Sequence, residues 1–121
     1  MKKYSFLLVC ILFLSGCLKE SQTQFVIDED QVFLVITQNT TKEELAQIAS
    51  ELKEKRNIDI DYSNSKFSAN GKISEVKLEV DCNDGFKGST HCSGTALKYQ
   101  NIGFLRDYTS GSDRVFHIGA M

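Results

Sequence analysis

Apolar residues follow two different spacings along this chain, and each spacing predicts a kind of element. The run 32–37 is β-branched or aromatic almost throughout, which is typical of a central strand covered on both faces. In 58–63 and 76–82 apolar and polar residues alternate, so each segment is expected to form a strand with one buried and one charged face. Between these two segments, Asn70-Gly71 is the sequence signal of a type I′ hairpin turn.

Residues 42–56 change to helical spacing. Their apolar positions recur at i, i+3, i+4 and i+7, namely Leu45, Ile48, Ala49 and Leu52. Thr41 and Glu44 have the spacing of a capping box, in which two side chains satisfy free amide groups at a helix start. The pattern predicts a surface helix of about four turns that packs one stripe on a sheet.

Three weaker segments complete the expected sheet. Residues 25–27 are compatible with a short edge strand, 86–93 with a third strand after a turn at 83–85, and 114–118 with a last short strand. The main order is then β-α-β-β-β. We expect an α+β fold of two layers, with one helix packed on a mainly antiparallel sheet, in a single small domain over 31–121.

The start of the chain has the pattern of a secretory leader. Two lysines precede an apolar run of about eleven residues, which is shorter than the roughly 20 needed to span a bilayer. Leu14-Ser15-Gly16-Cys17 resembles the lipobox of bacterial lipoproteins. That resemblance implies removal of the signal peptide 1–16 and acylation of Cys17.

The same resemblance predicts where the mature chain resides. Leu18 stands after the cysteine, where an aspartate favours inner-membrane retention in some bacteria, so an outer-membrane location is expected. The polar segment that follows suits a flexible tether, and 17–30 is assigned as lipidated anchor and tether.

Charge and motifs narrow the function classes. Two lysines leave with the leader, so the formal net charge of −2 becomes −4. A mildly acidic chain lacks the basic footprint of a nucleic-acid binder, and no run of Lys or Arg invites anionic lipid, so membrane contact is expected through the lipid alone. The nucleophile motif Gly-x-Ser-x-Gly does not occur. We expect no enzymatic activity and no cofactor.

The remaining cysteines suggest two alternatives. With Cys17 acylated and Cys10 removed, Cys82 and Cys92 are an even pair in an oxidising compartment, which favours a disulfide across a wide loop or bulge. The alternative is a metal-binding or thiol-dependent site that uses Cys82, His91 and Cys92, with His117 as a further ligand.

The C-terminal third contains a candidate binding patch. Tyr99, Phe104, Arg106 and Tyr108 have the residue types that dominate protein interfaces. The alternative is that these side chains close the open end of a small core.

Four stretches, 36–45, 51–55, 61–65 and 70–73, look like a small extracytoplasmic module at the C-terminal end of bacterial membrane metallopeptidases related to the β-lactam-sensing type, also found in standalone lipoproteins. The resemblance covers roughly 32–95 and implies a non-catalytic module. No His-Glu-x-x-His is present, so zinc proteolysis is not implied. The predicted function is a lipid-anchored binding module whose partner is another envelope protein.

Overall fold

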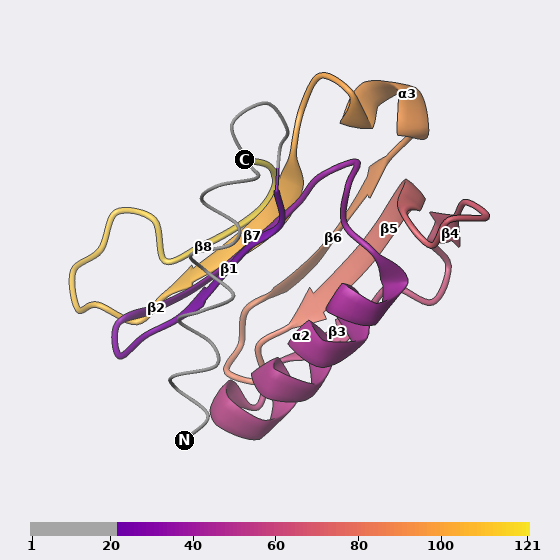
Figure 1. Cartoon of the computed structure of the whole chain (residues 1–121). Helices are drawn as coiled ribbons and strands as arrows, with labels where there is room; N and C mark the ends of the chain where they lie inside the picture. The colour runs from indigo at the N-terminus through magenta and orange to yellow at the C-terminus, as the bar shows by residue number, and fades with distance from the viewer. Residues whose placement is uncertain (1–21) are drawn as a thin grey trace.

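Two antiparallel sheets and one long helix make up the part of the chain that the structure, a computed structural model, describes, which is residues 22–121 (Figure 1). The helices are α2 (Lys42–Arg56) and the short α3 (Gly94–Leu97). The strands are β1 (Gln24–Ile27), β2 (Gln31–Ile36), β3 (Asp59–Asp61), β4 (Lys66–Phe67), β5 (Ile73–Asp81), β6 (Lys87–Cys92), β7 (Ile102–Asp107) and β8 (Phe116–Ala120).

The first sheet has the strand order β1-β2-β7-β8, and every pair in it is antiparallel. The second sheet is organised around β5, the longest strand. β3 pairs with the end of β5, β4 pairs with its start, and β6 runs along it from Val76 to Asp81. The run 32–36 is therefore an inner strand, as its composition predicts.

Helix α2 begins and ends at local signals. The Glu44 amide donates to Thr41 Oγ1 at 3.2 Å, and the Thr41 amide donates to Glu44 Oε1 at 2.9 Å, so the predicted capping box is confirmed. At the other end Asn57 takes a left-handed conformation with φ of 57°, which stops the helix.

The core lies between α2 and the two sheets. Of its predicted stripe, the helix buries Leu45, Ile48 and Leu52, whereas Ala49 is only partly buried. These side chains belong to a single cluster with residues from both sheets, including Val32, Leu34, Ile36, Val76, Leu78, Val80 and Phe104. Burial of this stripe joins the helix to both sheets at once.

The sheets also meet where β6 faces β8. A methyl group added to Gly88 of β6 would lie 2.9 Å from Cγ2 of Ile118 and 3.5 Å from the ring of Phe116. A residue without a side chain is needed at Gly88 because β8 packs directly over its backbone.

The molecule has two distinct ends. The "α3 end" contains α3, the start of α2, the β4–β5 turn and the last residue, since Ile73 N–H donates to the Thr40 carbonyl and Met121 N–H to the Asn101 carbonyl. The "Tyr108 end" contains the β1–β2 turn, the end of α2, the β5–β6 turn and the β7–β8 loop, since Tyr108 N–H donates to the Asp30 carbonyl (Figure 1).

The expected α+β class, with one main helix and mainly antiparallel pairing, is confirmed. Three details differ. The sheet is split in two, the segments 66–67, 94–97 and 102–107 are additional elements, and the last strand is at 116–120. At Asn70-Gly71 the chain does form a hairpin, but only Gly71 has a positive φ, so the turn is not type I′.

The described chain also bears on the boundaries of the assigned segments. Residues 24–27 pair with β2, so this part of the assigned tether 17–30 belongs to the sheet. The leader 1–16 and Cys17 lie outside the described residues. Within residues 22–121 no helix has the length and hydropathy required to cross a bilayer.

The helix stripe provides a test of the core. We expect Leu52→Ala to lower the free energy of unfolding by about 2–5 kcal/mol, because Leu52 is fully buried and its removal leaves a cavity. The control is Gln47→Ala, an exposed position on the same helix, which should change stability by less than about 0.5 kcal/mol. Urea unfolding measures both, and equal effects of the two changes would contradict the packing of α2.

Candidate interaction surface

Arg106 is a buried cation at the Tyr108 end. It comes two residues after Phe104 in β7, so both side chains lie on the same face of the strand, and Arg106 occupies the edge of the core with 8% of its surface exposed. Its Nε and Nη2 atoms donate to Asp84 Oδ2 at 3.0 and 2.8 Å. Its Nη1 atom donates to the carbonyls of Asp107 and Val115. Asp84 thus supplies the counter-charge that burial requires.

Aromatic rings surround this guanidinium. The Arg106 Cζ atom lies 4.5 Å from the ring centres of both Phe86 and Tyr108, and the Arg56 Cζ atom lies 5.8 Å from the Tyr108 ring. We call Phe86, Arg106, Tyr108 and Arg56 the arginine–aromatic cluster. Its members come from the β5–β6 turn, β7, the loop after β7 and the end of α2. Cation–π attraction holds these segments together.

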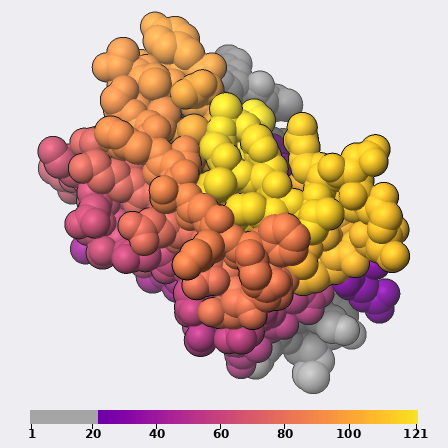
Figure 2. All heavy atoms as spheres, turned by 180° about the vertical axis from the view of Figure 1, so that it is seen from behind, coloured from indigo at the N-terminus to yellow at the C-terminus, as the bar shows by residue number. Residues whose placement is uncertain are grey.

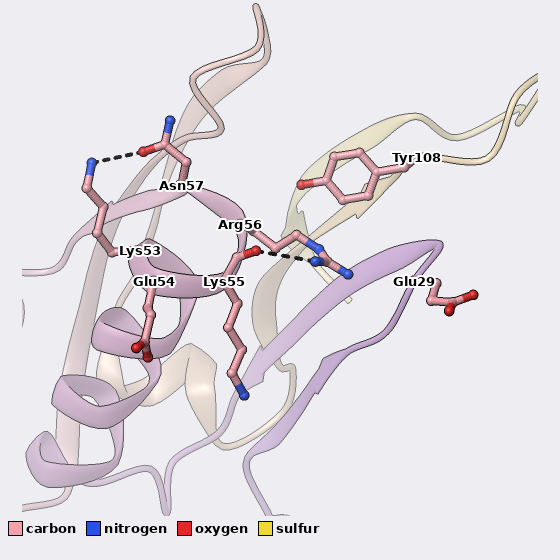
Figure 3. A pocket seen from close by; sticks show the side chains of 7 residues that line it. All are labelled: Glu29, Lys53, Glu54, Lys55, Arg56, Asn57 and Tyr108. Carbon is pink, nitrogen blue, oxygen red and sulfur yellow. Dashed lines mark hydrogen bonds between the residues drawn. The ribbon is translucent and has the colours of Figure 1, made fainter.

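A shallow hollow of about 470 Å³ opens beside the cluster (Figure 3). Its lining residues are Glu29, Lys53, Glu54, Lys55, Arg56, Asn57 and Tyr108. In Figure 3 the Tyr108 ring lies above Arg56 with its hydroxyl directed toward the end of the helix. The hollow therefore combines an aromatic wall with three basic side chains and two carboxylates.

The cations around the hollow differ in their partners. Lys53 is paired with Asp59 at 3.1 Å and Lys55 with Glu51 at 3.3 Å, and more than half of each lysine side chain is exposed. Among the described residues Arg56 donates to the backbone carbonyls of Asp28 and Lys55. Its charge is thus placed by carbonyl groups, which leaves it available to an anionic partner.

The two rings keep part of their surface in solvent. Phe86 and Tyr108 are each 37% exposed. Partial burial is the main cause that raises the pKa of the Tyr108 hydroxyl, which therefore stays protonated at neutral pH and can donate a hydrogen bond.

Comparison of the chain with protein-family models, with curated proteins and with solved structures finds no match. The resemblance to the metallopeptidase module therefore stays a prediction.

The structure brings together only part of the predicted binding patch. Arg106 and Tyr108 are in contact, but Phe104 is fully buried in the core and is not available to a partner. Tyr99 is 86% exposed and lies at the α3 end, beyond the opposite end of β7. The predicted set is thus divided between surface and core and between the two ends.

Phe86, Arg56 and Asp84 were missing from the predicted patch. Their chain positions are far apart from Arg106, and no local spacing connects them. The alternation of Ile102, Phe104 and Arg106 does indicate an arginine on the inner face of a strand. A buried arginine needs a carboxylate partner.

The expected disulfide between Cys82 and Cys92 is wrong. Both cysteines are free and buried. The Cys82 amide donates to the Phe86 carbonyl, whereas Cys92 is opposite Val76, six residues back along β5. Six residues of strand span roughly 20 Å, and a disulfide needs Cα atoms within about 7 Å. The short β5–β6 turn fixes this register and keeps the thiols apart.

The same register keeps Cys82 apart from His91 and Cys92, so these residues do not form the alternative metal-binding or thiol-dependent site. His91 lies on the exposed face of β6 with its Nε2 atom 2.7 Å from Glu75 Oε2, while the neighbouring Cys92 is on the buried face. Within residues 22–121 no three His, Cys, Asp or Glu side chains are arranged to hold a metal ion. Burial and the nearby Asp84 raise the pKa of Cys82 to about 11, which keeps the thiol protonated and unreactive.

The register of β5 and β6 predicts free thiols in the native protein. Protein purified without reductant, then denatured and alkylated, should carry label on both Cys82 and Cys92. Cys82 should label far more slowly before denaturation, because its sulfur is buried and protonated. Intact mass and peptide mapping measure both, and recovery of a linked 82–92 peptide would contradict the register.

Proposed function

We propose that this protein is a lipid-anchored, non-catalytic interaction module of the bacterial envelope. In this proposal acyl chains on Cys17 hold the chain in the outer membrane, and the arginine–aromatic cluster with its hollow binds another envelope protein. The observation that carries the proposal is the cluster itself: partly exposed Phe86 and Tyr108 rings held in place by a buried arginine.

The residue types and their rigidity support a binding role. Tyrosine and arginine dominate the binding energy of protein interfaces. Arg106 is fixed by Asp84 and by two backbone carbonyls, so the rings that contact it lose little freedom when a partner arrives. A surface ordered in advance binds more tightly than a mobile one of the same composition.

The charges indicate the chemistry of the partner. Arg56 meets carbonyl groups and an aromatic ring, and an incoming carboxylate would give it a stronger, charge-assisted hydrogen bond. The exposed pairs of Lys53 and Lys55 are weak and exchange readily. We therefore propose an acidic segment of the partner in the hollow, with an apolar side chain against Tyr108.

The lipid anchor rests on the lipobox pattern at 14–17 and on Lys2 and Lys3 before the apolar run. Two or three acyl chains give stable membrane attachment, whereas a single chain binds only marginally.

The lipid anchor is tested by removing the sulfur atom of Cys17. Cys17→Ser should move the protein out of the membrane fraction or leave it unprocessed, because acylation requires the thiol. Cys10→Ser is the matched control, since Cys10 is removed with the leader and its loss should leave fractionation unchanged. Fractionation and intact mass report both, and a membrane-bound Cys17→Ser protein of normal mass would overturn the lipoprotein assignment.

The binding surface is tested by site-specific photo-crosslinking in cells. A photoreactive residue at Lys55, beside the hollow, should capture a partner that the same residue at Lys77, exposed on β5, does not. Adding Arg56→Gln or Tyr108→Ala should reduce that product about tenfold, as expected for a hot-spot residue.

Tyr108→Phe, which keeps the ring, should retain most of the crosslink, and an unchanged melting temperature shows that the variants are folded. Equal capture from positions 55 and 77, or capture that survives both Arg56→Gln and Tyr108→Ala, would contradict the proposed surface.

A further inference from the structure

We infer that the α3 end of the domain lies against the bilayer, with Tyr99 in the lipid headgroup layer, and that the Tyr108 end points away from the membrane. This orientation rests on the proposed lipid anchor. In this orientation the α3 end contacts the membrane and binds anionic phospholipid headgroups.

The first argument is the point at which the chain leaves the domain. Thr23 Oγ1 is 2.6 Å from Oγ1 of the fully buried Thr40 and donates to Glu44 Oε1 at 3.1 Å. Gln24 then enters β1, where it is paired with Val35. The chain is therefore fixed to the domain from Thr23 onward, at the start of α2 and so at the α3 end.

The second argument is the length of chain between the lipid and this point. Six peptide units connect Cys17 to Thr23, and at about 3.5 Å per residue they span at most about 21 Å. Helix α2 alone extends about 22 Å toward the Tyr108 end. An acylated Cys17 thus keeps Thr23 and the start of α2 within about 21 Å of the membrane, whereas the Tyr108 end can lie a helix length farther away.

The third argument is Tyr99, which has no packing role. It is 86% exposed and is flanked by the exposed residues Lys98 and Gln100, whereas Leu97 anchors α3 in the core (Figure 2 shows the α3 segment in orange at the upper edge). Tyrosine is enriched at membrane interfaces because its ring prefers the headgroup layer and its hydroxyl prefers water. A tyrosine this exposed at the anchored end fits that layer.

The fourth argument is the distribution of charge. Basic side chains slightly exceed carboxylates at the α3 end, which carries Lys42, Lys66, Lys72 and Lys98 with Glu43, Glu44 and Glu75. The Tyr108 end carries more charges of both signs, namely Asp28, Glu29, Asp30, Asp81, Asp84, Asp107 and Asp113 with Lys53, Lys55, Arg56, Lys87, Arg106 and Arg114. An anionic membrane surface meets fewer carboxylates at the α3 end than at the Tyr108 end, so it favours contact with the first.

These lysines form no cluster in the sequence, which is why membrane contact was expected through the lipid alone. They are distributed over α2, β4, the β4–β5 turn and the residue after α3, and the fold brings these segments to one end. Lys66 is paired with Glu75 at 3.7 Å, and the lysine side chain is largely exposed. A headgroup phosphate can therefore replace Glu75 as the partner of Lys66.

The orientation can be tested by fluorescence quenching, because the chain contains no tryptophan. The lipidated full-length product is reconstituted into vesicles of phosphatidylethanolamine and phosphatidylglycerol that contain brominated acyl chains. A single probe is introduced as Tyr99→Trp or, as the matched control at the other end, as Asp113→Trp in the exposed loop after β7. We expect a blue shift and several-fold stronger quenching for Tyr99→Trp than for Asp113→Trp.

Adding Lys66→Gln and Lys98→Gln to Tyr99→Trp should weaken the quenching without releasing the protein, since the acyl chains remain. If lipidated protein does not stay with the vesicles, the anchor fails and the orientation fails with it. If it stays bound but Tyr99→Trp is quenched no more than Asp113→Trp, the anchor stands and the orientation is wrong.

Discussion

Burial of one apolar stripe on α2 is the interaction on which the rest of this fold depends. Within residues 22–121 the two sheets are separate ladders, so strand pairing alone does not join them. Leu45, Ile48 and Leu52 pack into a cluster with residues of both β2 and β5. The helix direction then decides which turns meet at each end, because its first residue is near the β4–β5 turn and its last near the β1–β2 and β5–β6 turns.

Arg106 places a buried positive charge at the edge of this core. Phe104 fills the centre of β7, and the same face of the strand carries a guanidinium two residues later. A buried cation costs several kcal/mol of desolvation unless it is paired. Asp84 supplies the pair from the other sheet, and Phe86 and Tyr108 cover the guanidinium. The contact therefore connects the two sheets and, at the same time, orders the surface that we propose binds a partner.

The two ends of the domain suit different environments. Thr23 donates a hydrogen bond to Glu44 of the capping box of α2, so the residues that start the helix also hold the segment that precedes β1. The arginine–aromatic cluster is at the other end of the same helix. In the orientation that we infer, this separation lets one short domain contact lipid at one end and an envelope protein at the other.

Local physics let the sequence determine the α+β class, α2 with its capping box, and strands β2, β3 and β5, because helical spacing, side chain to backbone hydrogen bonds and alternation act over a few residues. Only the tertiary structure decided the split of the sheet, the burial of Phe104, the separation of Tyr99 from Tyr108, and the register that keeps Cys82 from Cys92. These depend on contacts between segments distant along the chain. Spacing in the sequence determines how long a loop is, whereas strand register and packing determine which side chains meet.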